Sequence, residues 1–248
     1  MTGSLPFSVF KAVFREVMMK RRMICFSEAA YVFGMILLAL GTAFMEKADF
    51  GMSMVVAPAY LLHLKISQYI PGFTFGMAEY VLQAVLILCL SVIMRRLKKG
   101  YLFSFVTAVL YGFILDFCIS LVNLMPFTGI LFRVICFALG MIMCTAGVAF
   151  LFHTYISPEA YELFVKEISE KYHLEIGRVK TVYDLTSCLI SVLLSFLFFG
   201  FGHFEAVKAG TFVCALLNGW LIAQFSGLYD RTLEFRDALP YRRVFEQG

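Results

Sequence analysis

Residues 34–44 read GMILLALGTAF, and residues 140–150 read GMIMCTAGVAF. Six of these eleven aligned positions are identical, and further matches follow in the same order along the chain. The later matches are Ala59-Tyr60 with Ala160-Tyr161, Gly76 with Gly177, Ala108 with Ala215, and Gly112 with Gly219. An internal repeat constrains the architecture before any other feature does. The sequence therefore predicts two copies of one structural unit.

The composition predicts an integral membrane protein. Hydrophobic residues make up 61% of the 248 residues, charged residues only 15%, and the mean hydropathy is +0.84. Soluble domains are about half apolar and a quarter charged. A helix needs roughly 20 apolar residues to cross a bilayer. Six such runs are present, at about 24–45, 75–94, 101–122, 130–152, 179–201 and 205–226. The lipid bilayer is therefore the first expected partner.

Basic residues between the spans predict the orientation, because they favour the cytoplasmic side. They precede spans 1 and 5, fill the connection between spans 2 and 3, and follow span 6, whereas residues 123–129 carry no charge. Both termini are expected in the cytoplasm of a multi-pass inner-membrane protein. Each copy has three spans, so the second copy is inverted relative to the first. The predicted fold is all-α, with six transmembrane helices arranged as two inverted three-helix repeats.

The chain divides into four expected parts. These are an interfacial amphipathic segment at 1–22, the first repeat at 23–122, the second repeat at 123–226, and a cytoplasmic tail at 227–248. Ser157-Pro158-Glu159 is a favourable helix start. Apolar residues at helical spacing after it predict an amphipathic cytoplasmic helix over 157–171. Its counterpart at 53–66 is more apolar, and either an interfacial or a re-entrant segment is compatible with its composition.

Two glycine pairs recur in the repeat. Gly34 and Gly41 are seven residues apart, as are Gly140 and Gly147, so each pair lies on one helix face. Small residues on one face allow helix backbones to approach closely. We expect spans 1 and 4 to cross near the pseudo-two-fold axis through these faces.

Polar side chains at membrane depth are the candidate solute- or proton-binding residues, because such groups are costly there. Asp116, Glu79, Gln83 and Arg133 fall in the outer parts of their spans, and Asp116 and Glu79 would flank Arg133 if the three face one another. A purely structural ion pair is an equal alternative. Toward the inner side, Asp184 and Asn218 are candidates, and Asp184 can also pair with Lys180 at i−4.

Other function classes find no support in the sequence. No phosphate-binding loop or hydrolase motif is present. The seven cysteines lie in or beside apolar runs without metal-ligand spacing, so we expect buried thiols, no disulfide, no metal and no cofactor. The net charge of +4 reflects cytoplasmic flanks, which gives no reason to expect nucleic-acid binding or an enzyme.

Several short motifs resemble the YczE/YyaS/YitT group of bacterial integral membrane proteins, and its YczE-like members most closely. They are Gly41 with Ala48-Asp49-Phe50-Gly51-Met52-Ser53, Phe75-Gly76, Gly112-Phe113-Ile114-Leu115-Asp116, Gly177, and Gly210-Thr211. Met54 stands where the group usually has proline. The resemblance implies a multi-span protein of a bacterial inner membrane and does not imply an activity.

Inverted repeats are typical of secondary transporters, in which two equivalent halves let one site face either side of the membrane. The sequence is therefore interpreted as a transporter that exports a small organic solute, of unknown identity, using an ion gradient. Two alternatives remain: a substrate-binding membrane subunit that needs a separate energising partner, and a scaffold or assembly factor without transport. A homodimer is considered as the assembly state.

Overall fold

The structure is a computed structural model that describes residues 23–96, 99–126, 129–156, 159–174, 176–201 and 207–239. The expected interfacial segment 1–22, the Ser157-Pro158 helix start and the last residues of the tail lie outside these ranges. The elements are, in chain order, β1 (Met23–Phe26), α2 (Ser27–Ala48), α3 (Ala57–Ile66), α4 (Phe75–Met94), α5 (Lys99–Asn123), α6 (Ile130–Phe152), α7 (Ala160–Tyr172), α8 (Ile176–Phe199), α9 (Ala209–Thr232) and β2 (Leu233–Arg236).

Six helices, each of 20 to 25 residues, are long and apolar enough to cross a membrane: α2, α4, α5, α6, α8 and α9. Their outward faces carry large exposed apolar side chains, among them Leu216 at 80%, Val92 at 77% and Leu197 at 76% exposure. A soluble protein seldom exposes so much contiguous apolar surface. The chain is therefore a multi-pass helical membrane protein.

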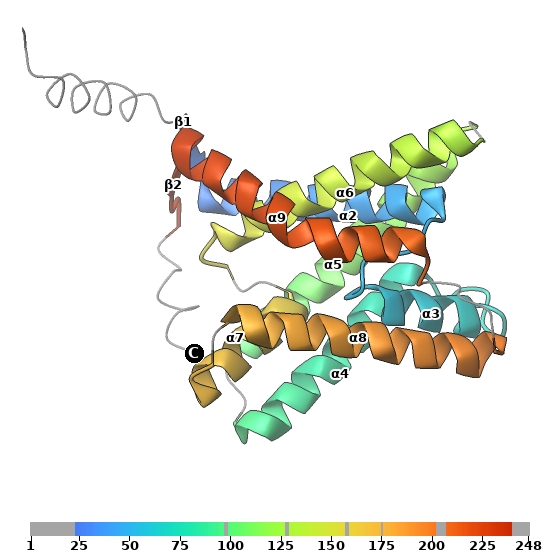
Figure 1. The fold of residues 1–248 in the computed structure, drawn as a ribbon. Helices are drawn as coiled ribbons and strands as arrows, with labels where there is room; N and C mark the ends of the chain where they lie inside the picture. The colour runs from blue at the N-terminus through green and yellow to red at the C-terminus, as the bar shows by residue number, and fades with distance from the viewer. Residues whose placement is uncertain are drawn as a thin grey trace, which may run out of the picture.

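The long helices form two groups (Figure 1). Helices α2, α6 and α9 lie together, α4 and α8 lie on the opposite side, and α5 joins the groups by packing against both α2 and α4. The short helices α3 and α7 sit at opposite ends of the bundle, and each packs against both α4 and α8.

Helices α2 and α6 cross at the two glycine pairs. A Cβ atom on Gly41 would lie 2.7 Å from the carbonyl oxygen of Gly140, and one on Gly147 would lie 2.6 Å from that of Gly34. Real Cβ atoms do not approach backbone atoms so closely, so any larger residue would push the helices apart. This crossing is the most extensive contact between two helices in the described chain.

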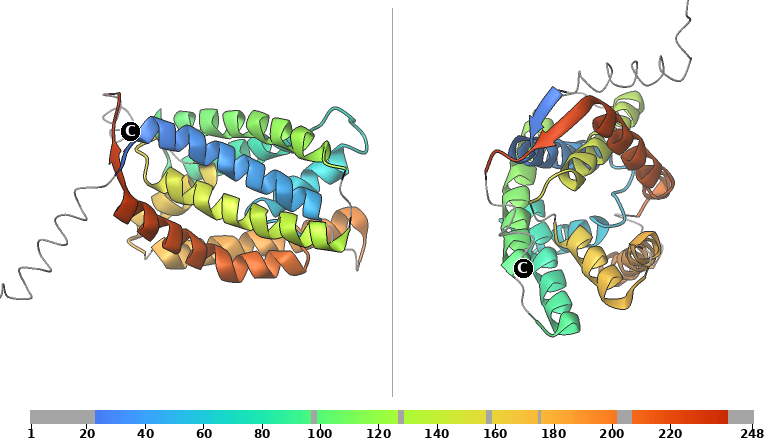
Figure 2. Two further views of the ribbon diagram at one scale, coloured as in Figure 1. Left: turned by 90° about the horizontal axis from the view of Figure 1, so that it is seen from above. Right: turned by 90° about the vertical axis from the view of Figure 1, so that its left-hand side faces the viewer.

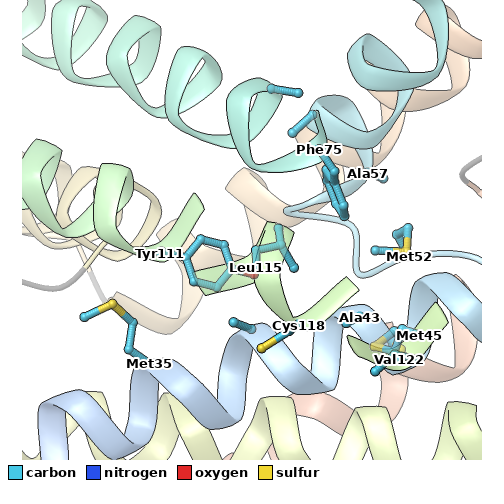
Figure 3. Close-up of a cluster of buried hydrophobic side chains, with 14 of the residues drawn as sticks. Met35, Ala43, Met45, Met52, Ala57, Phe75, Tyr111, Leu115, Cys118 and Val122 are labelled. Atoms are coloured by element: carbon cyan, nitrogen blue, oxygen red, sulfur yellow. The ribbon is translucent and has the colours of Figure 1, made fainter. Parts of the chain in front are cut away.

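The main apolar core lies between α2, α3, α4 and α5 (Figure 3). Its members include Met35 and Met45 from α2, Ala57 from α3, and Tyr111 and Leu115 from α5, all at most 2% exposed. Because Ala57, Ala59 and Leu61 are fully buried, protein covers one side of α3. Such cover is the condition under which a non-spanning segment can enter the membrane.

The ends of the bundle differ from expectation in two places. Residues 23–26 and 233–236 pair as a short parallel sheet, Met23 opposite Leu233, which the apolar periodicity did not predict. Helix α9 continues to Thr232 instead of ending at 226. It continues because Tyr229 stacks on Phe150 with ring centroids 4.1 Å apart, which keeps the last turns packed on α6.

Candidate functional site

A cavity of about 380 Å³ lies inside the bundle beside α8 and α9. Both halves of the chain line it. The first half contributes α2, the loop 52–56 before α3, and Tyr111 of α5, and the second half contributes α6, the start of α7, α8 and α9. Over their described residues α8 and α9 do not pack against each other, and the end-on view of Figure 2 (right) shows them apart. The cavity volume falls in the range of about 300–1,000 Å³ that is usual for small-molecule sites.

The start of α7 places a carboxyl group in this cavity. Glu159 precedes the first helical residue, is 5% exposed, and lines the cavity. Its Oε2 accepts a hydrogen bond from Gln83 Nε2 at 3.4 Å, and Gln83 Oε1 accepts one from the backbone N–H of Ala160 at 3.1 Å. Gln83 on α4 therefore holds the N-terminus of α7 in place. Among the residues that the structure describes, Oε1 of Glu159 has no hydrogen-bond partner.

A second buried carboxyl lies behind the cavity wall. Glu79 of α4 is fully buried, and its Oε2 accepts a hydrogen bond of 2.7 Å from the hydroxyl of Tyr161. The ring of Tyr161 lines the cavity. Glu79 thus fixes the orientation of a cavity side chain without lining the cavity itself.

The wall formed by α8 carries an ion pair. Lys180 Nζ lies 3.5 Å from Asp184 Oδ1, one helical turn away, and both side chains line the cavity and are about one-third exposed. The sequence left two alternatives for Asp184, a binding role and an i, i+4 pair with Lys180, and the structure contains the pair. The sequence repeat aligns Lys180 with Glu79 and Asp184 with Gln83, so the two halves differ in charge at matching positions.

Opposite this wall, the cavity surface combines polar and apolar groups. Asn218 of α9 lines it, and its buried Oδ1 has no hydrogen-bond partner within the described part of the chain. Thr42 of α2 and Tyr111 of α5 both line it, and their oxygens are 3.0 Å apart. This bond closes the cavity on the α2–α5 side.

Burial acts on the ionisation of the acids on α7. It raises the pKa of Glu159 well above its ordinary value, and the neighbouring carboxyls of Glu162 and Glu79 raise it further. Burial also raises the pKa of Glu162, while Lys180 acts in the opposite direction. Desolvation disfavours the charged form of a carboxyl, so these two groups hold protons to a higher pH than exposed glutamates do.

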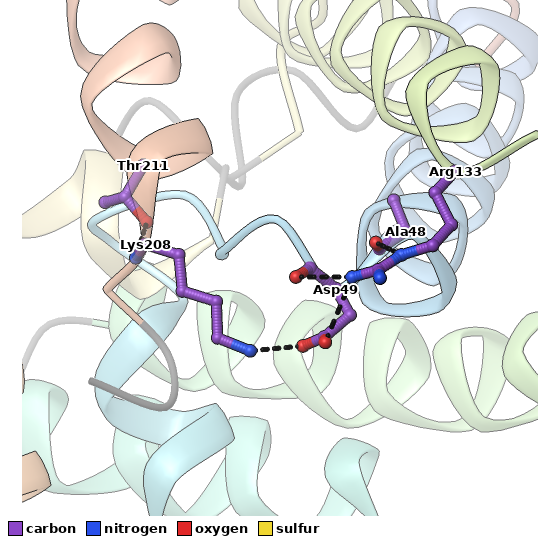
Figure 4. A network of polar contacts seen from close by, with 5 residues as sticks. All are labelled: Ala48, Asp49, Arg133, Lys208 and Thr211. Carbon is purple, nitrogen blue, oxygen red and sulfur yellow. Dashed lines mark hydrogen bonds and ion pairs between the residues drawn. The ribbon is translucent and has the colours of Figure 1, made fainter. Parts of the chain in front are cut away.

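Arg133, Asp116 and Glu79, which the sequence suggested as one cluster, have separate partners. Among the described residues they form no hydrogen bond or ion pair with one another. Arg133 Nη2 lies 3.1 Å from Asp49 Oδ2, and Arg133 Nε donates a hydrogen bond of 2.7 Å to the carbonyl oxygen of Ala48 (Figure 4). Lys208, just before α9, also binds Asp49, at 2.5 Å. These contacts tie the end of α2 to α6 and α9.

Asp116 caps a helix. Its Oδ1 accepts a hydrogen bond of 2.8 Å from the backbone N–H of Gly76, and its Oδ2 accepts one of 2.5 Å from the hydroxyl of Thr74. Thr74 is itself the N-cap residue of α4. Both oxygens of Asp116 are thus occupied at the first turn of α4, where backbone N–H groups lack partners within the helix.

Gly51 and Gly210-Thr211, two of the family-like motifs, meet in space. The backbone N–H of Gly210 donates to the carbonyl oxygen of Phe50 at 2.8 Å. Gly51 has a φ of 104°, and a Cβ there would lie 2.5 Å from the hydroxyl oxygen of Thr211. Positive φ and close approach both require glycine. The two motifs therefore fix the loop that carries Met52 and Ser53 into the cavity.

Sequence reasoning placed Gln83, Asp184 and Asn218 among the candidates, and the structure brings all three to one region. Sequence reasoning did not identify Glu159, Tyr161 or Tyr111. The sequence signal for Glu159 is its place in the predicted helix start Ser157-Pro158-Glu159, where an acidic residue favours the positive end of a helix. Its burial results from the packing of α7 against α4 and α8, a contact between distant segments that no local pattern indicates. Within the described part of the chain, no three His, Cys, Asp or Glu side chains gather as metal ligands.

The fold and the cavity define a polytopic helical membrane protein with an internal cavity, whose mostly apolar walls also carry polar and acidic groups. Comparison places it more closely: residues 25–227 match a family of unknown function, DUF6198, and the chain belongs to this family. It is 25% identical over 205 residues to the uncharacterized protein YyaS of Bacillus subtilis (strain 168), which covers 81% of this chain and 92% of YyaS. This similarity confirms the resemblance seen in the motifs. No solved structure matches the chain.

Proposed function

We propose that the protein is a secondary transporter built from two inverted three-span repeats, which exports a small organic solute across the bacterial inner membrane at the expense of an ion gradient. The observation that carries the proposal is the cavity that both halves line and into which buried polar groups are placed. A scaffold has no need of a buried cavity that contains unpaired polar atoms, because such atoms cost stability.

The inverted repeat is supported by reciprocal contacts. A two-fold axis that relates the halves would exchange Gly34 with Gly140 and Gly41 with Gly147. It would therefore turn the contact between Gly34 and Gly147 into the contact between Gly140 and Gly41. Both contacts are present. The packing of α3 on α4 and α8 likewise corresponds to that of α7 on α8 and α4.

The contact between α4 and α5 lacks a comparable counterpart between α8 and α9, and this asymmetry supports alternating access. Helices α4 and α5 pack closely, because Gly76 and Gly112 lie backbone to backbone. The repeat matches Gly112 with Gly219, and no atom of the described residues lies within 4 Å of a Cβ placed there. We propose that the helix pairs exchange roles, so that α8 closes on α9 when α5 leaves α4. Such an exchange would expose the cavity to the two sides in turn.

The proposal is tested with the full chain in liposomes, by recording currents or fluxes under an imposed proton gradient with a panel of cationic, neutral and anionic solutes. Wild-type protein should move at least one class of solute above protein-free liposomes. Ala215→Phe, which places a large side chain at the cavity wall, should abolish that flux. Leu216→Phe is the matched control because Leu216 is 80% exposed and does not line the cavity, and it should leave the flux intact. No flux for any class, or equal flux in both variants, would contradict the proposal.

A further inference from the structure

The cavity presents two unpaired hydrogen-bond acceptors. Oε1 of Glu159 and Oδ1 of Asn218 are buried, lack a partner, and belong to residues that line it. In the described chain the third buried side-chain atom without a partner is also an oxygen, Oε1 of Glu79 behind the wall. An unpaired buried acceptor is destabilising because it has lost its hydrogen bonds to water. A guest that donates hydrogen bonds would remove this cost.

Acidic side chains outnumber basic ones in the lining of the cavity. The lining acids are Glu159, Glu162 and Asp184, and Lys180 is the one cation among the lining residues described. The 3.5 Å contact assigns Lys180 to Asp184. Two carboxyl groups therefore remain without a paired cation. A positive charge on the guest would compensate them far better than a neutral or negative guest, since attraction between charges is strong where water is excluded.

The remaining walls suit a hydrocarbon body. Met45, Met52 and Met54 line one part of the cavity, and the rings of Tyr111, Tyr161 and Phe152 line others. Methionine side chains adapt to apolar guests of varied shape, and aromatic faces attract organic cations. The cavity thus combines an acidic end with soft apolar walls.

We propose that this cavity binds an organic amine in its protonated form, with Glu159 as the counter-ion and Asn218 as a second acceptor. The inference names the substrate class of the proposed transporter and rests on that function, but the binding step can be measured without transport.

Cation binding and proton binding should compete at Glu159. The titratable groups that interact with it or line the same cavity are Glu79 on α4, Tyr161 and Glu162 on α7, Lys180 and Asp184 on α8, Tyr31 on α2, Tyr111 on α5 and Cys144 on α6. A protonated Glu159 is neutral and attracts no cation. Because burial and the nearby acids raise its pKa, protonation occurs at a higher pH than usual. The affinity for an amine should therefore fall as the pH is lowered through that raised value, and below it each bound amine should displace one proton from Glu159.

Three probes of nearly equal size test the proposal: 4-phenylbutylamine, 4-phenylbutanol and 4-phenylbutyrate, which are cationic, neutral and anionic at neutral pH. Their binding to the detergent-purified full chain is measured by calorimetry and by thermal stabilisation. The amine should bind at least about tenfold more tightly than the other two, since a compensated buried charge contributes more than about 1.4 kcal/mol. Equal affinities, preference for the anion, or no binding of the amine would overturn the inference.

Variants locate the site. Glu159→Gln should lower amine affinity about tenfold or more and remove its pH dependence, because the counter-ion is lost. Asn218→Leu should weaken binding while keeping the pH dependence, and it provides a second variant if Glu159→Gln does not fold. Glu170→Gln, on the exposed side of α7, is the control and should bind as wild type does. Unchanged affinity in both cavity variants would contradict the proposal.

Flux of the same probes separates this inference from the proposed function. Amine binding without flux would support the site and contradict transport. Flux of the anion or the alcohol with no preference for the amine would support transport and contradict the substrate class.

Discussion

At the residue scale, Glu159 and Asp116 exchange the roles that the sequence suggested. Asp116 stands out in an apolar span, yet both of its oxygens bind the first turn of α4. Glu159 reads as an ordinary helix cap, yet it is buried in the cavity with one oxygen unpaired. A sequence gives the depth of a residue along its span, but not the helix face or the partner. Those depend on contacts between segments far apart in the chain.

Asp116→Ala should destabilise the protein by about 2 kcal/mol, because a charged acceptor is removed from the hydroxyl of Thr74 and the N–H of Gly76. Asp116→Asn retains one acceptor oxygen and should cost less. Phe117→Ala, at a neighbouring position 69% exposed, serves as the control. Reversible unfolding in detergent micelles provides the measurement. Full stability of Asp116→Ala together with lost flux would return Asp116 to a role in solute or proton handling.

At the element scale, much of the arrangement could be predicted. The six spans follow from apolar run length, and the glycine pairs indicated which helix faces cross. The sequence did not predict that α3 and α7 both pack against α4 and α8, since short helices of mixed polarity are equally compatible with the membrane surface. It also did not predict the β1–β2 pairing, because strands of four residues leave almost no periodic signal.

The packing of α8 and α9 offers a test of the proposed exchange between helix pairs. Gly219→Leu should leave stability unchanged within about 0.5 kcal/mol, because a Cβ at this position meets open space. It should reduce flux about tenfold or more, since overpacking a close helix contact costs about 1–3 kcal/mol in the state where α8 meets α9.

Gly112→Leu is the matched variant in the first half. A Cβ there would lie 2.8 Å from the carbonyl oxygen of Gly76, so this variant should destabilise the observed state. Differential scanning fluorimetry and liposome flux measure the two effects. Wild-type flux in Gly219→Leu would show that α8 and α9 need no close approach during transport.

At the scale of the whole molecule, the repeat relates the two halves and their differences indicate the chemistry. The glycine crossing is common to both halves, whereas α4 carries Glu79 and Gln83 where α8 carries Lys180 and Asp184. The class of an all-helical membrane protein with six long apolar helices therefore follows from composition and apolar run length. The cavity followed only from the structure, because its walls come from seven separate segments of both halves.

The proposed mechanism requires the helix pairs α8–α9 and α4–α5 to open and close in alternation. Spin labels are introduced as an unnatural amino acid at two pairs of exposed positions. Leu189 and Leu217 report the distance between α8 and α9. The repeat-related Leu88 and Leu110 report the distance between α4 and α5. Distance distributions are recorded by pulsed electron spin resonance in lipid nanodiscs, across pH and with 4-phenylbutylamine present or absent. Alternating access predicts two populations for each pair of labels. The shorter α8–α9 distance should appear together with the longer α4–α5 distance. A single distance for each pair that stays the same under every condition would contradict it.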